Sequence, residues 1–368
     1  METSADIKVS VIVPIYNAAD FLRPALDSVI VQTLREIEII CIDDGSTDKS
    51  LEILKEYQEK DERVRIVTET NAGPALARNN GIRRARGEYL AFLDADDFYH
   101  PEFLESLYNL ARRDVLDIAI SQYDIYNTRK SRFEASAGAD HSDIFTPGKV
   151  TSKSEYPDII LASTTGAAWN KLFRRSFIED KGLTFLQEVR MYEDVYFVVN
   201  AMSLAERVGK VHKILMHHRI HSEQSRVKHF SKYYAQVPVV YLKIKEFLMA
   251  HGMFAPLFLS YLNLSASRCY KIFNILSSDA KEHFWNMLHE EYAELLGWQG
   301  KDASDFESVE VCEFAVYVQL YNYTEYKRRK SRGKKFSASR VKQDVQLAKK
   351  KKRFRRFFGK IFGRKDKK

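Results

Sequence analysis

Residues 89–97 read Tyr-Leu-Ala-Phe-Leu-Asp-Ala-Asp-Asp, an apolar run that ends directly in three carboxylates. Such a short run of large apolar side chains favours a buried β-strand. Clustered negative charge at the end of a buried strand is unfavourable without a cation. Carboxylates with this spacing suit Mg²⁺ or Mn²⁺, which bind one or two of them together with substrate phosphates. We therefore expect a divalent metal site here, with a solvated acidic turn as the alternative.

Strand-like and helix-like segments alternate on both sides of this stretch. We expect strands at 9–14, 38–42, 64–67, 89–93 and 116–121, and helices at 19–32, 51–57, 74–84 and 101–111. This alternation predicts an α/β fold with a mostly parallel sheet and helices on both faces. Ligands of such sheets bind at the carboxyl ends of the strands, which is where the polar clusters of this chain lie.

The rest of the chain changes character twice. Residues 127–165 are polar and are predicted to form an irregular insertion or loop, whereas 230–326 have helical periodicity. Residues 327–368 contain 21 Lys or Arg and two Asp, a net charge of +19, although the whole chain carries only +8. An acidic body therefore precedes a basic tail. We expect three parts, at 1–226, 227–326 and 327–368.

Composition narrows the class of protein. No apolar run approaches the ~18–20 residues that span a bilayer, and residues 1–8 lack the basic start and apolar stretch of a signal peptide. The three cysteines are far apart, which excludes a disulfide framework and suits a reducing cytosol. We expect a cytoplasmic protein.

The tail nevertheless has an apolar face. Its large apolar side chains recur at helical spacing among the Lys and Arg residues, at Phe354, Phe357, Phe358, Ile361 and Phe362. We expect residues 349–365 to form an amphipathic helix that binds an anionic membrane surface, peripherally on the inner face of the plasma membrane. A solvated end and a nucleic-acid contact are the alternatives.

Two further polar clusters follow predicted strands. Residues 14–17, Pro-Ile-Tyr-Asn, end the first strand, and residues 43–48, Asp-Asp-Gly-Ser-Thr-Asp, end the second. The proline and the aromatic ring can form a shelf for a flat base. Asp43 and Asp44 can accept hydrogen bonds from a base or a ribose, while Ser46 or Asp48 caps the next helix. A simple turn and helix capping alone are the alternatives.

Charged residues also lie on two predicted helices. Arg78, within 74–84, can reach phosphates, although an arginine on a helix usually belongs to a solvated face. Glu193 and Asp194 precede a helical apolar stretch. They can stabilise its N-terminus, or one of them can act as a general base.

The order of these clusters, most specifically 9–17, 43–48, 77–81 and 92–97, resembles the family 2 glycosyltransferases of the GT-A fold over about residues 8–222. Residues 168–173 and 219–221 are similar to the branch that builds bacterial surface polysaccharides. The resemblance implies inverting transfer of a sugar from a nucleotide-sugar, expected to be UDP-linked, to a hydroxyl of a glycan or lipid-linked acceptor. It also implies Mn²⁺ or Mg²⁺ as the cofactor.

The resemblance also implies a role for individual residues. Base and ribose contacts match Pro14, Tyr16, Asn17, Asp43 and Asp44, and a residue near the nucleotide matches Arg78. The D-x-D pair matches Asp94, at ribose or metal, and Asp96, at the metal, while the role of Asp97 stays open. Asp194 matches the catalytic base and Glu193 its orienting neighbour. Lys171 is expected at the diphosphate or acceptor or else on the surface, and His221 at the metal or diphosphate.

Two other classes of protein compete with this interpretation. A nucleotidyltransferase acting on sugar phosphates also combines an α/β sheet with acidic metal ligands, but residues 11–17 lack the glycine-rich loop expected of it. A nucleic-acid-binding protein would use the basic tail and leave the acidic clusters of the body unexplained. We expect no nucleic-acid partner. The Gln-x-x-Arg-Trp motif of processive members is absent, which favours addition of one or a few sugars.

Overall fold

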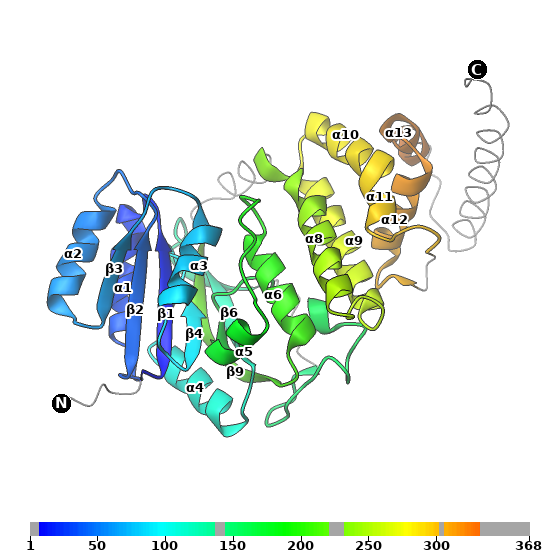
Figure 1. Ribbon diagram of the computed structural model, residues 1–368. Coiled ribbons are helices and arrows are strands. Elements are labelled where there is room, and N and C mark those ends of the chain that lie inside the picture. Colours follow the sequence, from blue (N-terminus) through cyan, green and yellow to red (C-terminus); the bar gives the residue numbers. More distant parts are fainter. Residues whose placement is uncertain (1–6, 137–143, 221–231, 302–304, 332–368) are drawn as a thin grey trace, which may run out of the picture. The chain divides into compact units, whose positions relative to one another are not determined.

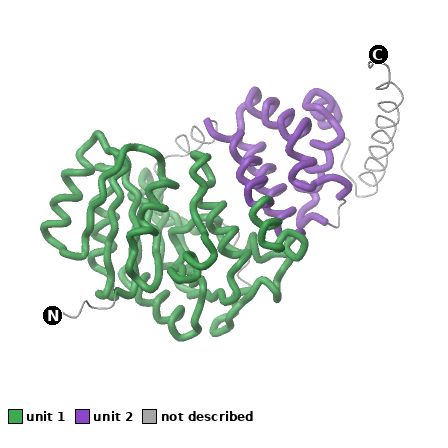
Figure 2. The backbone as a smooth tube through the Cα atoms, in the orientation of Figure 1, with its two compact units in different colours: residues 1–226, 246–257 green, residues 227–245, 258–368 purple. Residues whose placement is uncertain are grey.

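The computed structural model describes residues 7–136, 144–220, 232–301 and 305–331 (Figure 1). The chain separates into two compact units (Figure 2). Unit 1 comprises residues 1–226 and 246–257, and unit 2 comprises 227–245 and 258–368. The domain boundaries expected from the sequence stay a prediction.

Unit 1 is built on one sheet, whose described strands number nine and follow the order β3-β2-β1-β4-β8-β6-β9-β5, with β7 paired to β6. The strands are β1 (Val9–Ile15), β2 (Ile37–Asp43), β3 (Val64–Thr68), β4 (Tyr89–Phe92), β5 (Phe98–Tyr99), β6 (Ile118–Asn127), β7 (Arg132–Ala135), β8 (Lys171–Arg174) and β9 (Val208–Ile220). The run β3-β2-β1-β4 is parallel, as predicted. Its carboxyl ends therefore meet at one edge.

Helices cover both faces of this sheet, because alternate side chains of each strand point to opposite faces. The helices of unit 1 are α1 (Ala19–Ile30), α2 (Ser50–Lys60), α3 (Pro74–Arg84), α4 (Phe103–Arg113), α5 (Arg175–Asp180), α6 (Glu193–Leu204) and the short η2 (Ile160–Ala162). Odd-numbered residues of β1 join one core cluster with α1, α2 and α4. On the other face, Ala77 of α3 packs on Ile40 and Ile42.

Glycine brings α3 especially close to the sheet. A Cβ atom at Gly81 would lie 2.3 Å from Cγ2 of Ile12, closer than non-bonded carbons come. Four aromatic rings, Phe92, Phe173, Phe185 and Phe197, pack together beside this contact and attach α6 to the same face. The starts of α3 and α6 are thereby held near the carboxyl end of β4.

The other half of the sheet is mixed. β8 runs antiparallel to β4 and β6, and β6 runs parallel to β9. We expected residues 127–165 to be irregular, but β6 continues to Asn127 and forms a hairpin with β7. The polar composition hid this hairpin because one of its faces is solvated.

Unit 2 is helical, as predicted for residues 230–326. Its helices are α9 (Phe258–Ile275), α10 (Ser278–Met287), the π-helical turn η3 (Leu288–Tyr292), α11 (Ala293–Leu295), α12 (Val309–Leu320) and α13 (Tyr323–Ser331), while α8 (Gln236–Ala250) contributes residues to both units. Trp285 and Trp298 are fully buried, so the aromatics of this region form its core. Among the described helices, none has the length and apolarity needed to cross a membrane.

Candidate active site

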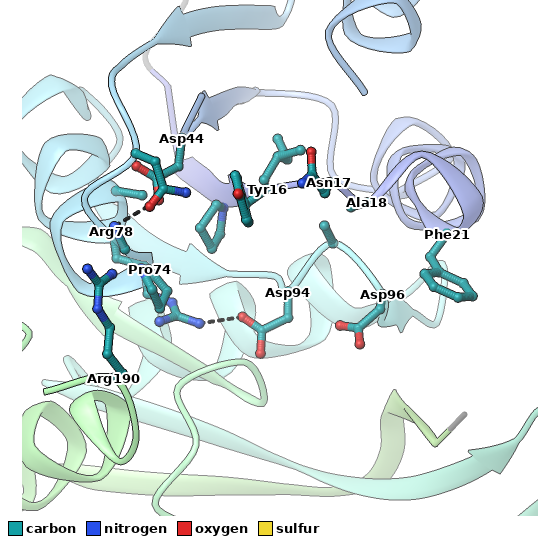
Figure 3. Close-up of a pocket in the computed structure, with 16 residues that line it drawn as sticks. Tyr16, Asn17, Ala18, Phe21, Asp44, Pro74, Arg78, Asp94, Asp96 and Arg190 are labelled. Atoms are coloured by element: carbon teal, nitrogen blue, oxygen red, sulfur yellow. Dashed lines mark hydrogen bonds and ion pairs between the residues drawn. The ribbon is translucent and has the colours of Figure 1, made fainter. Parts of the chain in front are cut away.

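The carboxyl ends of β1, β2 and β4 surround a cavity of about 460 Å³ (Figure 3). Known ligand pockets have volumes of about 300–1,000 Å³. The cavity is lined by Pro14, Ile15, Tyr16, Asn17, Ala18, Phe21, Asp44, Asn71, Gly73, Pro74, Ala77, Arg78, Asp94, Ala95, Asp96 and Arg190. Seven of the residues predicted for base, ribose or nucleotide contacts or for the metal therefore line one cavity.

The end of β1 supplies an exposed aromatic ring held by a rigid turn. Tyr16 is 52% exposed, which leaves its ring available to a ligand. Asn17 has a φ of 49°, a conformation that Asn tolerates better than most residues. Its backbone N–H donates to Ser46 Oγ, and its side-chain Oδ1 accepts from the backbone N–H of Thr47. These bonds fasten the loop after β1 to the loop after β2.

The two adjacent carboxylates after β2 have different surroundings. Asp44 lines the cavity, and its two oxygens accept hydrogen bonds of 2.8 Å from the backbone N–H groups of Ala72 and Gly73. Asp43 is buried outside the lining, and its Oδ1 accepts from the backbone N–H of Ser46. Asp43 thus helps to hold the turn, and its expected contact with the base or ribose stays a prediction.

Of the two residues expected to cap the helix after β2, Asp48 bonds the start of that helix, and the Ser46 hydroxyl accepts from Asn17. The N-cap position of α2 is Lys49 and has no side-chain cap. Asp48 instead accepts from the backbone N–H groups of Ala19 and Ser50, so it links the starts of α1 and α2.

Arg78 is the centre of the charged side of the cavity (Figure 3). Its Nη2 donates to Asp94 Oδ1 at 2.6 Å, and its Nη1 donates to Glu193 Oε1 at 2.9 Å. The Arg78 side chain is only 8% exposed. Burial alone would lower its pKa, but the charges of Asp94 and Glu193 outweigh burial and raise it. Arg78 is therefore a permanent cation that joins the D-x-D strand end to the start of α6.

The start of α6 has an unusual backbone. Tyr192, its N-cap residue, has a φ of 67°, which is uncommon for a bulky side chain and often marks a functional site. Asp194 follows in the first turn and is partly buried, and its Oδ1 accepts from the backbone N–H of Val195. Burial, then the charge of Glu193, raise the pKa of Asp194 to about 7, although Arg78 opposes this shift. Such a pKa suits a general base near neutral pH. Asp194 does not itself line the described cavity.

The third acid of the D-A-D-D stretch is buried in an ion pair. Asp97 Oδ1 lies 3.1 Å from Nδ1 of His218 and accepts from the backbone N–H of Arg219. Burial raises the pKa of Asp97 to about 7. Burial would lower the pKa of His218, but the charge of Asp97 outweighs burial and raises it to about 9. Asp97 thus fixes the strand end to β9 and is not available as a ligand.

Lys171 requires a correction. We expected it at the diphosphate or acceptor, or on the surface, but its side chain is fully buried away from the cavity lining. Its Nζ donates to the carbonyl oxygens of Thr165 and Ala167 and to Oδ1 of Asn170. Lys171 therefore has a structural role, holding the segment that leads into β8.

The residues of the cavity fit a divalent ion in part. Asp94 and Asp96 both line it, and two carboxylates suffice for an ion that also binds phosphates. Within the described ranges, no group of three or more His, Cys, Asp or Glu side chains could hold a metal ion. His221, the further ligand expected from the sequence, lies outside the described residues.

Sequence reasoning missed Arg190. It lies on loop residues before α6 and lines the cavity next to Gly73, where an added Cβ would lie 2.2 Å from Arg190 Nη1. Gly73 has a φ of 99°, so its backbone conformation favours glycine, and the flexible end of Arg190 occupies the space beside it. A signal existed, since Arg190 stands only three residues before Glu193.

Known proteins are similar to this chain in sequence. The family model of glycosyl transferase family 2 matches residues 10–181. EpsH of Bacillus subtilis, named as a glycosyltransferase, is 37% identical over 224 residues, which are 60% of this chain and 62% of EpsH. The uncharacterized glycosyltransferase YibD of Escherichia coli is 31% identical over 278 residues, which are 72% of this chain and 79% of YibD. The chain thus spans less than two thirds of EpsH but more than three quarters of YibD.

A solved structure has the same fold. TarS 1–349 of S. aureus, in complex with UDP-GlcNAc, has a TM-score of 0.61 at 22% identity, and the match covers 79% of this chain and 82% of that one. The predicted GT-A fold is confirmed. YibD is 31% identical over 79% of its length, and the family model covers the strand ends that form the cavity. The chain therefore belongs to glycosyl transferase family 2.

Proposed function

We propose that this protein transfers a sugar from a UDP-sugar to a hydroxyl of a glycan or lipid-linked acceptor, with inversion at the anomeric carbon, in the synthesis of a bacterial surface polysaccharide. One observation carries the proposal: Asp44, Asp94 and Asp96 line one cavity, and Arg78 joins that cavity to Glu193, the neighbour of Asp194 in the chain. In this proposal the exposed Tyr16 ring serves the base, Asp44 is a hydrogen-bond acceptor, and Asp94 and Asp96 would hold the metal ion.

The donor binds along the cavity in this proposal. Pro14 and Tyr16 contact the base, and Asp44 accepts from the base imide, since a carboxylate oxygen has a second lone pair beside the one used by the backbone. Arg190 lies next to Gly73 on the same side of the cavity and adds a donor there. UDP as the nucleotide is supported by the UDP-GlcNAc complex of the similar TarS structure.

Asp94 and Asp96 would hold Mn²⁺ or Mg²⁺ together with the donor's phosphates. When bound, such an ion offsets the negative charge of the leaving nucleoside diphosphate. Arg78 keeps Asp94 in place and limits the repulsion between the acidic residues around it. Residues of the chain position the sugar and remove the proton from the acceptor hydroxyl.

Asp194 takes the proton of the acceptor hydroxyl as the new glycosidic bond forms. A carboxylate whose pKa is raised to about 7 is a stronger base than an ordinary one and is still ionised in about half of the molecules at neutral pH. Glu193, held by Arg78, orients it. Attack on the face opposite the leaving diphosphate inverts the anomeric carbon.

We further propose that the enzyme works in the cytoplasm at the inner face of the plasma membrane. Support comes from the sequence of residues 349–365, which lie outside the described residues. Removal of residues 349–368 should abolish co-sedimentation with anionic vesicles at low salt and leave activity on a soluble acceptor. Unchanged sedimentation after truncation, or a preference for neutral vesicles, would refute the membrane contact.

A donor panel tests the proposed function. The full chain is incubated with UDP-, GDP- and dTDP-sugars, with Mn²⁺, with Mg²⁺ and with EDTA, and the released nucleoside diphosphate is measured. We expect release from at least one UDP-sugar only when a metal ion is present. Formation of a nucleotide-sugar from a sugar phosphate and a nucleoside triphosphate would instead favour a nucleotidyltransferase. Tight RNA or DNA binding without any release would favour the basic-tail alternative.

A further inference from the structure

Aromatic side chains gather on one face of the sheet just beyond the D-A-D-D stretch. Phe98 of β5 lies opposite His217 of β9, which also lies opposite Asp124 of β6, while Tyr126 of β6 lies opposite Phe133 of β7. Side chains opposite each other on neighbouring strands share a face. We call Phe98, Tyr126, Phe133 and His217 the aromatic platform.

The rings of the platform contact one another. The Phe98 and Tyr126 centroids are 5.7 Å apart, those of Tyr126 and Phe133 are 5.1 Å apart, and His217 lies 4.9 Å from both Phe98 and Phe133. The platform is not a buried core, because Phe133 is 54% exposed and Phe98 and Tyr126 are partly exposed. An aromatic cluster that reaches the surface in this way is a candidate binding site.

Arg219 connects the platform to the candidate active site. Its Nε donates to the backbone carbonyl oxygen of Asp96 at 2.8 Å, and its guanidinium carbon lies 5.1 Å from the Phe98 ring centroid and 5.7 Å from that of Tyr126. Phe98 itself follows Asp97 directly in the chain. The platform therefore begins two residues from a carboxylate that lines the cavity.

The orientation of the donor in the cavity indicates that the acceptor would approach along the aromatic platform. In Figure 3, Tyr16 and Asp94 lie between Asp44 on one side and Asp96 on the other. If the base lies at Asp44, as the proposed function has it, the transferred sugar points toward Asp96. The acceptor must then approach from the Asp96 end, where the platform lies.

The chemistry of the platform suits a saccharide. The face of an aromatic ring is electronegative and attracts the C–H groups on one face of a pyranose. Polar groups stand among the rings: His217 Nδ1 lies 2.6 Å from Asp124 Oδ1, and the guanidinium of Arg219 carries several donors. Flat rings interleaved with fixed polar groups match a sugar better than they match an aliphatic lipid chain, which offers no hydrogen bonds.

We propose that the aromatic platform is an acceptor subsite, which binds pyranose rings of the acceptor glycan and guides its hydroxyl toward Asp96. This inference rests on the proposed function. It assigns Phe133, the exposed ring of the platform, as the residue that stacks on the acceptor and Arg219 as the residue that holds the platform beside the cavity.

Saccharide binding by the full chain tests the platform. The probes are maltotriose, cellotriose and N-acetylchitotriose at millimolar concentration with UDP and Mn²⁺, observed by saturation-transfer NMR. We expect at least one trisaccharide to bind the parent, Phe133→Ala to weaken its binding on the order of five-fold, the effect of losing one aromatic stacking contact, and Phe133→Tyr to restore it. Ile214→Ala is the control, since Ile214 is a 48%-exposed apolar residue of β9 outside the platform.

Two results would overturn the subsite. One is that none of the three trisaccharides binds the parent, or that binding survives Phe133→Ala unchanged. The other is that light scattering finds a parent oligomer which Phe133→Ala dissociates without affecting saccharide binding, since the platform would then be a contact between copies of the chain. Nucleoside diphosphate release by the parent without acceptor is measured in parallel. Release without saccharide binding rejects only the subsite, and binding without release rejects only the proposed function.

Discussion

Arg78 and Glu193, 115 residues apart in the chain, form a buried ion pair with an Nη1–Oε1 distance of 2.9 Å. The second arm of the same guanidinium binds Asp94 at 2.6 Å. A planar guanidinium can hold two carboxylates at a fixed spacing, which a lysine cannot do. Arg78 thus sets the position of the base-bearing helix α6 relative to the strand end that carries the D-x-D pair.

Arg78→Ala should be strongly destabilising. It leaves Glu193 partly buried without its cation, and breaking a buried ion pair costs about 3–5 kcal/mol. Arg78→Lys should retain more stability but lose most turnover, because one ammonium cannot hold both carboxylates. Denaturant unfolding and nucleoside diphosphate release measure the two effects. The control is Arg23→Ala, whose partner Glu56 is exposed, so that little or no loss of stability is expected. Equal losses in the two alanine variants would contradict the bridging role.

Asp194→Asn should lower kcat by about 10²–10⁴-fold, the usual contribution of a general base, and leave donor affinity nearly unchanged. The amide is close in size to the carboxylate but cannot take the proton. Calorimetric titration with UDP measures donor affinity, and transfer at saturating donor measures kcat. Weak UDP binding with normal turnover at saturation would make Asp194 a donor-binding residue instead.

The pKa of Asp194 predicts two opposite pH effects. Because the base must be ionised, kcat of the parent should fall as the pH drops below about 7. The folded pKa lies above the unfolded value of 3.8, so ionisation of Asp194 destabilises the fold progressively between pH 4 and 7 and fully above pH 7. Asp194→Asn should therefore raise Tm more at pH 8 than at pH 5. A gain in Tm that is larger at pH 5 would mean that the carboxylate is not disfavoured in the fold.

Lys171→Met should reduce stability without changing the affinity of the folded protein for UDP. The substitution leaves three oxygen acceptors without their donor, at about 1–3 kcal/mol for each group that stays unsatisfied. Thermal unfolding and calorimetric titration separate the two properties. Lys213→Met is the control, because that lysine side chain is 62% exposed. A loss of UDP affinity with unchanged Tm would restore Lys171 to the donor site.

The sequence predicts the first half of the fold well because its signals are local. The helix expected at 74–84 has those bounds in the structure, and the strands 9–14 and 64–67 differ by one residue at most. The strand β5 has only two residues and pairs with β9 more than a hundred residues later, so no local hydrophobic periodicity predicts it.

In the candidate site too, local signals could be predicted from the sequence, whereas contacts between distant elements could not. Pro14, Tyr16, Asp44, Asp94 and Asp96 stand next to predicted strand ends, and the rule that ligands bind there is enough to bring them together. The partners of Arg78 and of Asp97 could not be predicted, because each bond joins side chains from distant elements. The prediction for Lys171 failed although its partners are local. A lysine is rarely buried, so nothing in the sequence indicated that Lys171 would bond three acceptors of its own loop.

The most direct test of the account is the release of nucleoside diphosphate from UDP-sugars by the parent and by Asp96→Ala, each with Mn²⁺ and with EDTA. Asp279→Ala, an exposed carboxylate variant on α10, serves as the control. We predict release by the parent and by the control with Mn²⁺, no release in EDTA, and none by a folded Asp96→Ala protein under either condition. Release by Asp96→Ala at the parent rate with Mn²⁺ would contradict the assignment of the metal site, and release in EDTA by the parent would contradict metal dependence itself.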